Sequence, residues 1–260
     1  MSNSTVDCMC VVTGASAGLG EALAINAAKS GSAVVLVGRS RESLSAVGTR
    51  CTAAGAAKVA VITADLGIAS GVNSVAASLG REILSGYRKL FLFNNASTIE
   101  PIESLADLSF NDMERALSVN VSAAVALASA VVRLNRDMDI QECSIINISS
   151  GVSINPVIGW SAYCISKAAL NMLTKCIAGE TASTRRPVYS ISVNPGPLDT
   201  RMQERIRSAD KSKSPATEKF SKMHQEGKLK KPEDVAAKLF DIVCSRRFAT
   251  GEFVDFNQVT

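Results

Sequence analysis

Short runs of apolar residues alternate with helical patterns along the whole chain. The apolar runs, most of them continuous, lie at 9–13, 33–37, 59–63, 89–93, 143–148, 188–193 and 252–256. Strands that helices bury on both faces have this pattern, so we expect the strands of a parallel sheet. The spacing of apolar positions predicts helices over about 18–30, 40–54, 70–86, 111–135, 160–184 and 232–246.

This alternation of strands and helices predicts an α/β fold. We expect a single-domain, doubly wound, Rossmann-like parallel sheet of about seven strands, flanked by helices on both faces. With 260 residues and 47% hydrophobic content, residues 1–260 can bury one large core. Ligands of such sheets bind beyond the carboxyl ends of the strands, so chemistry is expected in the segments that follow strands.

A glycine-rich segment follows the first predicted strand and runs into a predicted helix. Its sequence is Gly14-Ala15-Ser16-Ala17-Gly18-Leu19-Gly20. Small residues let the backbone approach a pyrophosphate, and the free N–H groups and dipole of the helix face the anion. A tight strand-to-helix turn without a ligand is the alternative interpretation.

The second predicted strand ends in Gly38-Arg39-Ser40. Folds that prefer NAD usually have an Asp or Glu here, which binds the ribose 2′-hydroxyl. A guanidinium beside a hydroxyl suits a 2′-phosphate instead, whereas a carboxylate would repel it. We therefore predict NADP(H) as the cofactor, with surface arginines at a helix start as the alternative.

Tyr163 and Lys167 lie four residues apart in a predicted helix, so their side chains share one face. An ordinary Tyr, with a pKa of about 10, is a poor acid at neutral pH. A neighbouring ammonium lowers that pKa towards the range useful for acid–base catalysis. The same spacing also recurs on solvated helix faces, so this pair needs support from other motifs.

The order of the motifs supplies that support, because it resembles the short-chain dehydrogenase/reductase family over nearly the whole chain. After the pieces above, the matching residues are Asp65-Leu66, Asn94-Asn95-Ala96, Asn120, Asn147-Ile148-Ser149-Ser150, Tyr163 with Lys167, and Asn194-Pro195-Gly196. One position departs from the family pattern, since Ser97 follows Ala96 where members usually have Gly. A bulkier residue there could narrow the contact with the cofactor ribose.

The resemblance implies a reductase in which Tyr163 donates the proton and Lys167 lowers its pKa and binds the nicotinamide ribose. Ser150 holds the carbonyl oxygen as a second donor, with Ser149 as its alternative, and Asn120 links Lys167 to solvent through a water. Contacts with NADP(H) are implied for Gly14, Ser16, Gly18, Leu19, Gly20, Arg39, Ser40, Asp65, Leu66, Asn94, Ala96, Tyr163, Lys167, Pro195, Gly196, Leu198 and Thr200.

Within the family, the last third of the chain is most similar to sepiapterin reductases, in the segments 159–173, 195–203, 226–239 and 250–256. The first of these segments also resembles microbial reductases of α-diketones such as benzil. The implied substrate is a small carbonyl compound, a pterin or a diketone, bound by Ser150, Tyr163 and Asp255. In the pterin case Asp255 anchors the ring N–H groups; a solvated carboxylate on a terminal strand is the alternative. A non-catalytic NADP-binding regulator is a less favoured interpretation, and a purely structural or interaction protein is the least favoured one.

The segment at about 198–231 is polar and basic, with ten Lys or Arg against five Asp or Glu over 199–231. The resemblance implies the family's substrate loop, and a solvated helical excursion or mobile loop is the alternative. His224, the single histidine, is expected at the surface. The apolar helices at 111–135 and 160–184 are the ones that pair in family homodimers, so we expect a homodimer.

Charge and cysteine content limit the remaining possibilities. A net charge of +4 does not call for nucleic acid. The seven scattered cysteines, without a C-x-x-C pair, predict neither disulfides nor a metal site and suit a reducing cytoplasm. Polar Met1–Asp7 leaves no room for a signal peptide, and the apolar stretch Val119–Val132 is too short to span a bilayer. We therefore expect a cytoplasmic protein without a membrane or nucleic-acid partner.

Overall fold

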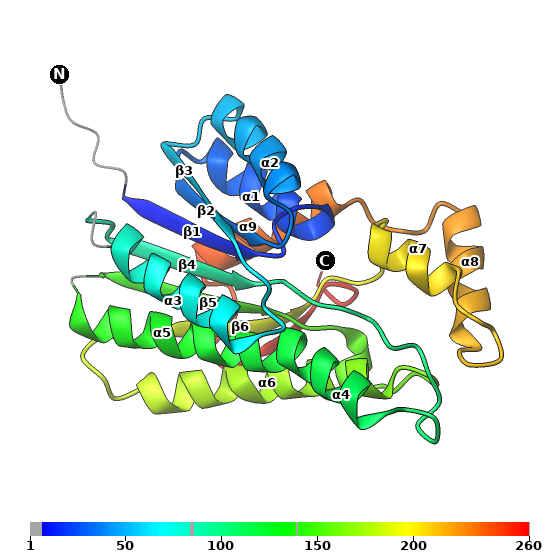
Figure 1. Ribbon diagram of the computed structural model, residues 1–260. Coiled ribbons are helices and arrows are strands. Elements are labelled where there is room, and N and C mark those ends of the chain that lie inside the picture. Colours follow the sequence, from blue (N-terminus) through cyan, green and yellow to red (C-terminus); the bar gives the residue numbers. More distant parts are fainter. Residues whose placement is uncertain (1–6, 84–85, 139, 260) are drawn as a thin grey trace.

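The computed structural model describes residues 7–83, 86–138 and 140–259 (Figure 1). Within these residues one parallel sheet has the strand order β3-β2-β1-β4-β5-β6-β7. Its strands are β1 (Cys8–Thr13), β2 (Ala33–Gly38), β3 (Lys58–Thr63), β4 (Lys89–Asn94), β5 (Glu142–Ile148), β6 (Tyr189–Asn194) and β7 (Phe253–Asp255). The predicted doubly wound parallel sheet is confirmed, although the last strand is shorter than its apolar pattern.

Helices cover both faces of the sheet. On one face lie α1 (Gly18–Lys29), α2 (Arg41–Ala53) and α9 (Pro232–Ser245); on the other lie α3 (Ala69–Ile83), α5 (Ala123–Asp137) and α6 (Ser161–Thr181) (Figure 1). The predicted helices occur at these places. The predicted helix over 70–86 has its last turn at residues 84–85, which lie outside the described residues, as do residues 1–6 of the polar N-terminal segment.

The continuous apolar runs are explained by burial on two sides. Cys10 and Val12 of β1 point into the core under α1 and α9, whereas Met9 and Val11 point into the core under α3 and α5. Successive side chains of a strand alternate between faces, so a strand covered on both faces must be apolar throughout. Each fully buried Val or Leu contributes roughly 1.5–3 kcal/mol.

The carboxyl ends of the strands bring polar side chains to one edge of the sheet. Asn94 at the end of β4 pairs in register with Asn147 of β5, and Asn194 at the end of β6 pairs with Asp255 of β7. The strand order reverses between β1 and β4, and a crevice at such a switch point is where doubly wound sheets bind ligands.

The helix predicted over 111–135 is interrupted. A π-helical turn, Ser118–Ser122, separates α4 (Phe110–Leu117) from α5. The helical stretch Phe110–Asp137 is nevertheless continuous, and by length and composition it could cross a membrane. This corrects the expectation that the apolar stretch is too short. Leu127 and Val131 of α5 pack against the sheet, and core helices that cover a sheet pass the same test.

The segment predicted as the substrate loop is an arm with two helices, α7 (Arg201–Arg207) and α8 (Ala216–Gln225), which project beyond the sheet (Figure 1). A β-bridge between Leu198 and Lys230 closes its base. His224 is exposed on α8. Many of the polar residues of this segment therefore lie on the solvent-exposed faces of these two helices.

Candidate functional site

The glycine-rich turn packs too closely on its neighbours to accept side chains. Gly14 and Gly18 have φ of +65° and +59°, in the region that favours glycine. A Cβ on Gly14 would lie 2.9 Å from the Cα of Ala96, and one on Gly20 would lie 2.3 Å from the carbonyl oxygen of Gly14. The turn therefore presents bare backbone at the end of β1.

Thr13 and Asn95 join this turn to the end of β4. The Thr13 hydroxyl donates to the carbonyl of Phe93 and accepts from the N–H groups of Asn95 (2.9 Å) and Ala96 (3.0 Å). The Asn95 side chain donates to the carbonyl of Thr13 at 2.9 Å. The sequence alone does not show this role of either residue, because their partners depend on the pairing of β1 with β4.

The N-terminus of α1 is open to an anion. Ala17 stands at its N-cap position and supplies no side-chain hydrogen bond, so the first N–H groups of the helix have no side-chain cap. Predicted Ser16 and Leu19 lie on either side of this position, and the Thr200 methyl group would lie 3.1 Å from a Cβ on Gly18. A bare turn leading to an uncapped helix fits a dinucleotide pyrophosphate.

Arg39 is exposed after β2, and it makes no hydrogen bond or ion pair with the rest of the described chain. The hydroxyl of Ser40 caps α2, accepting from the N–H of Ser43 at 3.2 Å. A free guanidinium at this place fits a 2′-phosphate. After β3, Asp65 accepts from the N–H of Gly67 at 2.9 Å and Leu66 is buried.

Asn94 begins a buried row of amides at the ends of the strands. Its Nδ2 donates to Oδ1 of Asn147 at 2.9 Å, and Asn147 donates to the Thr174 hydroxyl of α6 at 2.8 Å. Oδ1 of Asn94 is buried without a partner among the described residues, beside a small cavity that Ala96 and Asn120 also line. An unpaired buried acceptor fits a donor from a bound group.

Asn120 lies in the π-helical turn, and its side chain is fully engaged. Oδ1 accepts from the N–H of Thr98 (2.8 Å) and from the Ser97 hydroxyl (3.1 Å). Nδ2 donates to the carbonyl of Thr98 (2.9 Å) and to the hydroxyl of Ser166 (3.1 Å). Ser97, the departure from the family pattern, is thus tied to Asn120. Asn120 contacts α6 next to Lys167, and its water-mediated link to that residue stays a prediction.

Tyr163 and Lys167 share the buried face of α6, as their spacing predicted. Nζ of Lys167 lies 5.2 Å from the centroid of the Tyr163 ring and donates to the carbonyl of Ile148 at 2.8 Å. The Ser149 hydroxyl donates to the backbone carbonyl of Lys167, whereas the Ser150 hydroxyl is a hydrogen-bond partner of Tyr163. Of the two candidate serines, Ser150 is the one beside the phenol.

Burial controls the protonation of this pair. Burial raises the pKa of Tyr163 well above its ordinary value, Cys164 adds to the rise, and the Ser150 hydroxyl opposes it. Burial lowers the pKa of Lys167 to about 7. The expectation that Lys167 lowers the pKa of Tyr163 is wrong for this structure, because desolvation of the phenolate dominates.

Asp255 belongs to a network around the turn after β6. Its Oδ1 accepts from Asn194 Nδ2 and from the backbone and side chain of Asn257, each at 2.9 Å. Lys230, whose place in this network no sequence motif indicates, donates to Asn257 at 3.0 Å and packs on Gly196 beside Pro195. Asp255 is therefore not a free edge carboxylate, but its Oδ2 makes no hydrogen bond with the described residues.

An apolar wall stands beside Tyr163. It combines Ile99 from the segment after β4, Trp160 at the start of α6 and Ile206 of α7, all buried, with partly buried Val152, Met202 and Phe220. Three separate parts of the chain thus meet at the phenol. The packing of Trp160 could not be predicted from the sequence, because several of the residues that it contacts lie far along the chain, in the arm.

Comparison with known proteins agrees with this geometry. The model of the short chain dehydrogenase family matches residues 9–211. The chain is 33% identical over 257 residues to sepiapterin reductase of Mus musculus, covering 95% of this chain and 96% of that protein. It is 31% identical over 239 residues to a benzil reductase ((S)-benzoin forming) of Bacillus subtilis, covering 90% and 92%.

A solved structure has the same fold. L-sorbose reductase from Gluconobacter frateurii, solved in complex with NADPH and L-sorbose, superimposes with a TM-score of 0.80 at 25% identity. The superposition covers 95% of this chain and 94% of that one. With its parallel sheet, glycine turn and Tyr–Lys pair at one edge, this chain belongs to the short-chain dehydrogenase/reductase family and is an oxidoreductase.

Proposed function

We propose that the protein is an NADPH-dependent carbonyl reductase. The observation that carries the proposal is the meeting of Ser150, Tyr163 and Lys167, after β5 and on α6, in a fold whose β1 leads into the glycine turn. The turn, the open end of α1 and Arg39 would hold the cofactor, which supplies a hydride when bound. The remaining chemistry is delivery of a proton to the carbonyl oxygen.

Tyr163 holds the proton that the carbonyl oxygen needs. Because its pKa is raised by burial, the phenol is fully protonated at neutral pH, and the same rise makes it a weaker acid than an ordinary Tyr. Ser150 can donate a second hydrogen bond to the oxygen as negative charge develops on it. Lys167, with a pKa near 7, can gain and lose a proton at working pH and so resupply the site.

We further propose that the substrate is a pterin with a side-chain ketone or diketone, as in sepiapterin. Support comes from the similarity to sepiapterin reductases, from the apolar wall around Trp160, and from the unengaged Oδ2 of Asp255. A broad α-diketone reductase is the second candidate, favoured by the similarity to benzil reductases and by the same apolar wall. The seven free cysteines suit a reducing compartment, so we propose the cytoplasm.

The test is NADPH consumption measured side by side with sepiapterin, benzil and a simple aldehyde. The pterin proposal expects sepiapterin to have a kcat/KM at least about tenfold above the others, since a recognised ring adds binding energy. Reduction of benzil without reduction of sepiapterin would support the second candidate. If none of the three carbonyl compounds led to consumption of NADPH, the proposed activity would be contradicted.

Asp255→Ala separates the two substrate classes. A carboxylate that pairs with ring N–H groups orients a pterin, so its loss should raise KM for sepiapterin well over about tenfold and spare benzil. Asn257→Ala is the matched control, because it removes hydrogen bonds to Asp255 and keeps the carboxylate. Equal damage to both substrates by Asp255→Ala would show a role in the turn and contradict the anchoring role.

A further inference from the structure

Trp160 lies between the arm and the phenol of Tyr163. It occupies the N-cap position of α6, three residues before Tyr163, and is 3% exposed. Its ring meets the Tyr163 ring edge to face, with centroids 6.2 Å apart and planes at 79°. On the arm side it stacks on Phe220 of α8 at 5.5 Å and 14°. One indole therefore contacts both the arm and the acid.

A buried hydrogen bond fixes the indole to the arm. Nε1 of Trp160 donates to the hydroxyl of Ser214 at 3.0 Å, and Ser214 is fully buried. A buried indole N–H needs such a partner, since leaving it unpaired destabilises the folded state. This bond also fixes the rotation of the ring, which stacking on Phe220 would leave free.

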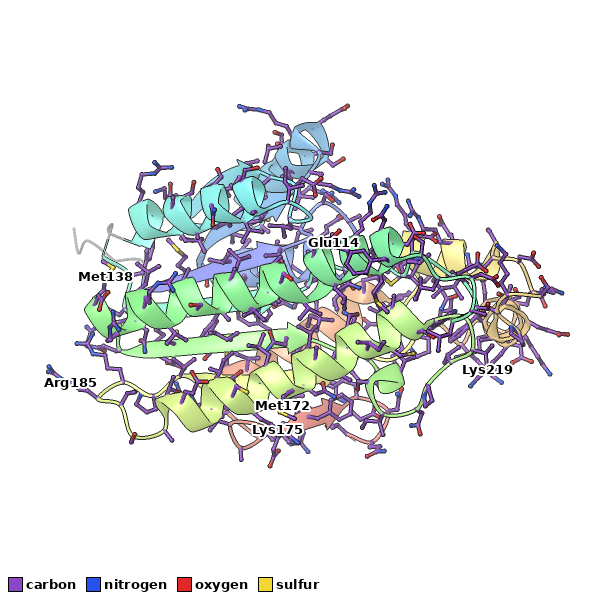
Figure 2. All side chains as sticks on the ribbon, turned by 60° about the horizontal axis from the view of Figure 1, so that its bottom comes forward. Glu114, Met138, Met172, Lys175, Arg185 and Lys219 are labelled. Atoms are coloured by element: carbon purple, nitrogen blue, oxygen red, sulfur yellow. The ribbon has the colours of Figure 1, made fainter. Side chains whose placement is uncertain are left out.

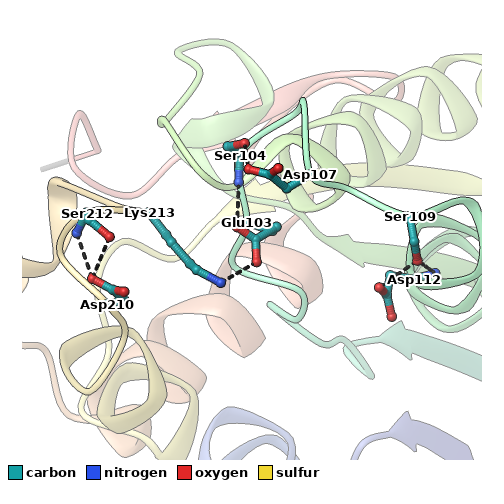
Figure 3. A network of polar contacts seen from close by, with 8 residues as sticks. All are labelled: Glu103, Ser104, Asp107, Ser109, Asp112, Asp210, Ser212 and Lys213. Atoms are coloured by element: carbon teal, nitrogen blue, oxygen red, sulfur yellow. Dashed lines mark hydrogen bonds and ion pairs between the residues drawn. The ribbon is translucent and has the colours of Figure 1, made fainter.

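The arm is docked at this place by backbone contact and by charge. A Cβ on Gly159 would lie 2.3 Å from the carbonyl oxygen of Lys213, so only glycine fits before Trp160. Figure 3 shows Lys213 reaching Glu103, in the segment after β4. Its Nζ donates to Oε2 of Glu103 at 2.6 Å. The N–H of Glu103 in turn donates to the carbonyl of Gly159. The arm and the start of α6 thus form one packed unit.

The contacts around the phenol show what Trp160 contributes. Lys167 lies over the ring at 5.2 Å from its centroid, and Ser150 is next to the hydroxyl. Neither contact fixes the tilt of the Tyr163 ring, because Lys167 acts at the centre of the ring and Ser150 acts at the hydroxyl oxygen. The aromatic neighbour of Tyr163 is Trp160, and an edge-to-face pair has a preferred orientation.

We propose that Trp160 is a positioning residue, through which the docked arm holds the Tyr163 phenol in the orientation needed for proton donation. This proposal rests on the proposed reductase function. Docking of the arm then acts on the rate of turnover, and not only on retention of the substrate. A residue that merely fills the core would need neither the indole N–H nor Ser214.

The test uses Trp160→Phe and Ser214→Ala in the full chain, each of which breaks the bond between Nε1 and Oγ. We expect each variant to lower kcat about tenfold, since a small misplacement of a reacting group is costly, with KM for NADPH within about twofold of wild type. The double variant should lose no more than the worse single one, because both remove the same bond. Ser212→Ala is the control: its hydroxyl, on the same arm, bonds Asp210 and should leave kcat unchanged.

A second readout follows the phenol itself. A loosened Trp160 admits water to Tyr163, so the pKa of Tyr163 should fall towards 10 and its phenolate should form at lower pH than in the wild type. The phenolate absorbance of each variant, with the same variant carrying Tyr163→Phe subtracted, measures this shift without turnover. It therefore tests the positioning role even if no tried carbonyl is a substrate.

The result that would overturn the proposal is a higher KM for the carbonyl substrate with unchanged kcat, pH profile and phenol titration. The arm would then only retain the substrate. Ser214→Ala is the milder change, so it keeps the test decisive if Trp160→Phe does not fold. A fall in kcat without movement of the phenol titration would also contradict a role that acts through Tyr163.

Discussion

At the scale of the residue, burial sets the chemistry of the site more than charge pairing does. Tyr163 and Lys167 are both nearly inaccessible, and in each case desolvation favours the neutral form. The pKa of the phenol rises, so the phenol stays protonated and becomes a weaker acid, whereas the pKa of the amine falls to about 7. In the proposed mechanism Tyr163 is the buried neutral acid, and Lys167 is a neighbouring base that titrates near pH 7.

Tyr163→Phe should abolish turnover while NADPH still binds. The change removes only the hydroxyl, and general acid catalysis is typically worth about 10²–10⁴-fold in rate. The measurements are kcat, and NADPH affinity by fluorescence titration. Retention of more than about a tenth of wild-type kcat would remove Tyr163 from the acid role.

Lys167→Met should stabilise the protein at neutral pH, at the expense of activity. The unfolded chain has the ordinary pKa of 10.5 and the folded chain one of about 7, so between these values the unfolded state binds more protons. The free energy of unfolding of the wild-type protein therefore rises as pH rises from about 7 towards 10.5, because the buried amine no longer has to lose a proton on folding. At and below neutrality the burial of Lys167 destabilises the folded state most. The variant should have a Tm about 5 °C higher near neutrality and a smaller advantage near about pH 9.5.

The matched control for this prediction is Lys175→Met, at an exposed position of the same helix (Figure 2). It should show no pH-dependent difference in Tm from the wild type. A Tm advantage of Lys167→Met that is equal at both pH values would contradict the buried-amine explanation.

Arg39 should select NADPH over NADH. A charge-assisted contact with a 2′-phosphate is worth about 1.5–3 kcal/mol, which is at least about tenfold in kcat/KM. Arg39→Asp should erase or reverse the preference, because it places like charges together. Arg41→Asp makes the same change of charge two residues away and should have a smaller effect. Wild-type protein that uses both cofactors equally would disprove this argument.

The candidate site residues could be selected from the sequence, because most of them belong to recognisable motifs after the strands or on helix α6. The hydrogen-bond partners of these residues could not be predicted from the sequence. Asn95 bonds Thr13 only because β4 pairs with β1, and Asn194 bonds Asp255 only because β6 pairs with β7 in that register. The sign of the Tyr163 shift was missed for the same reason, since burial depends on the packed fold.

At the scale of the element, local pattern predicted helices and strands well but not their irregularities. The π-helical turn at Ser118–Ser122 contains no Gly or Pro that would predict an irregularity, yet it carries the buried Asn120 towards Thr98 and Ser166. Single π-turns inside helices are frequent at functional sites. The two helices of the arm agree with the solvated helical excursion that the sequence left open, although the polar composition alone also fits a mobile loop.

The turn between β1 and α1 gives a prediction at this scale. Gly20→Ala places a Cβ 2.3 Å from the Gly14 carbonyl oxygen, so the turn must open. We expect NADPH affinity to fall by more than about tenfold, because backbone shifts of even about 1 Å are costly in a positioned site. Gly80→Ala is the matched control: it is also inside a helix, and its Cβ meets its nearest atom at 4.0 Å. It should keep the affinity and gain helix stability, and an equal loss in both variants would contradict the argument.

At the scale of the whole molecule, the class of sheet followed from the alternation of patterns, whereas the order of strands depends on pairing between distant segments. The order places the end of β1 next to that of β4, which brings the glycine turn to Asn95 and Ala96. The same packing leaves one surface unexplained. Figure 2 shows α5 and α6 running side by side, with Met172 on α6.

The last prediction is that this surface makes a homodimer. Met172 and Ile165 of α6 and Val125 of α5 are 59%, 48% and 42% exposed, although both helices already bury one face against the sheet. Exposed apolar side chains on neighbouring helices mark an interface, and two-fold dimers are the commonest oligomers. Sedimentation at micromolar concentration should give a dimer for the wild type.

Met172→Asp should shift that dimer towards monomer, because a carboxylate without a partner would be buried at the interface. Ile68→Asp is the matched control, since Ile68 is 55% exposed in the segment after β3, outside α5 and α6, and its change should leave the dimer intact. A monomeric wild type would defeat the prediction, and so would a dimer that Met172→Asp does not weaken. In the second case the contact would lie on another face, and α5 and α6 would be core helices whose outer residues meet only solvent.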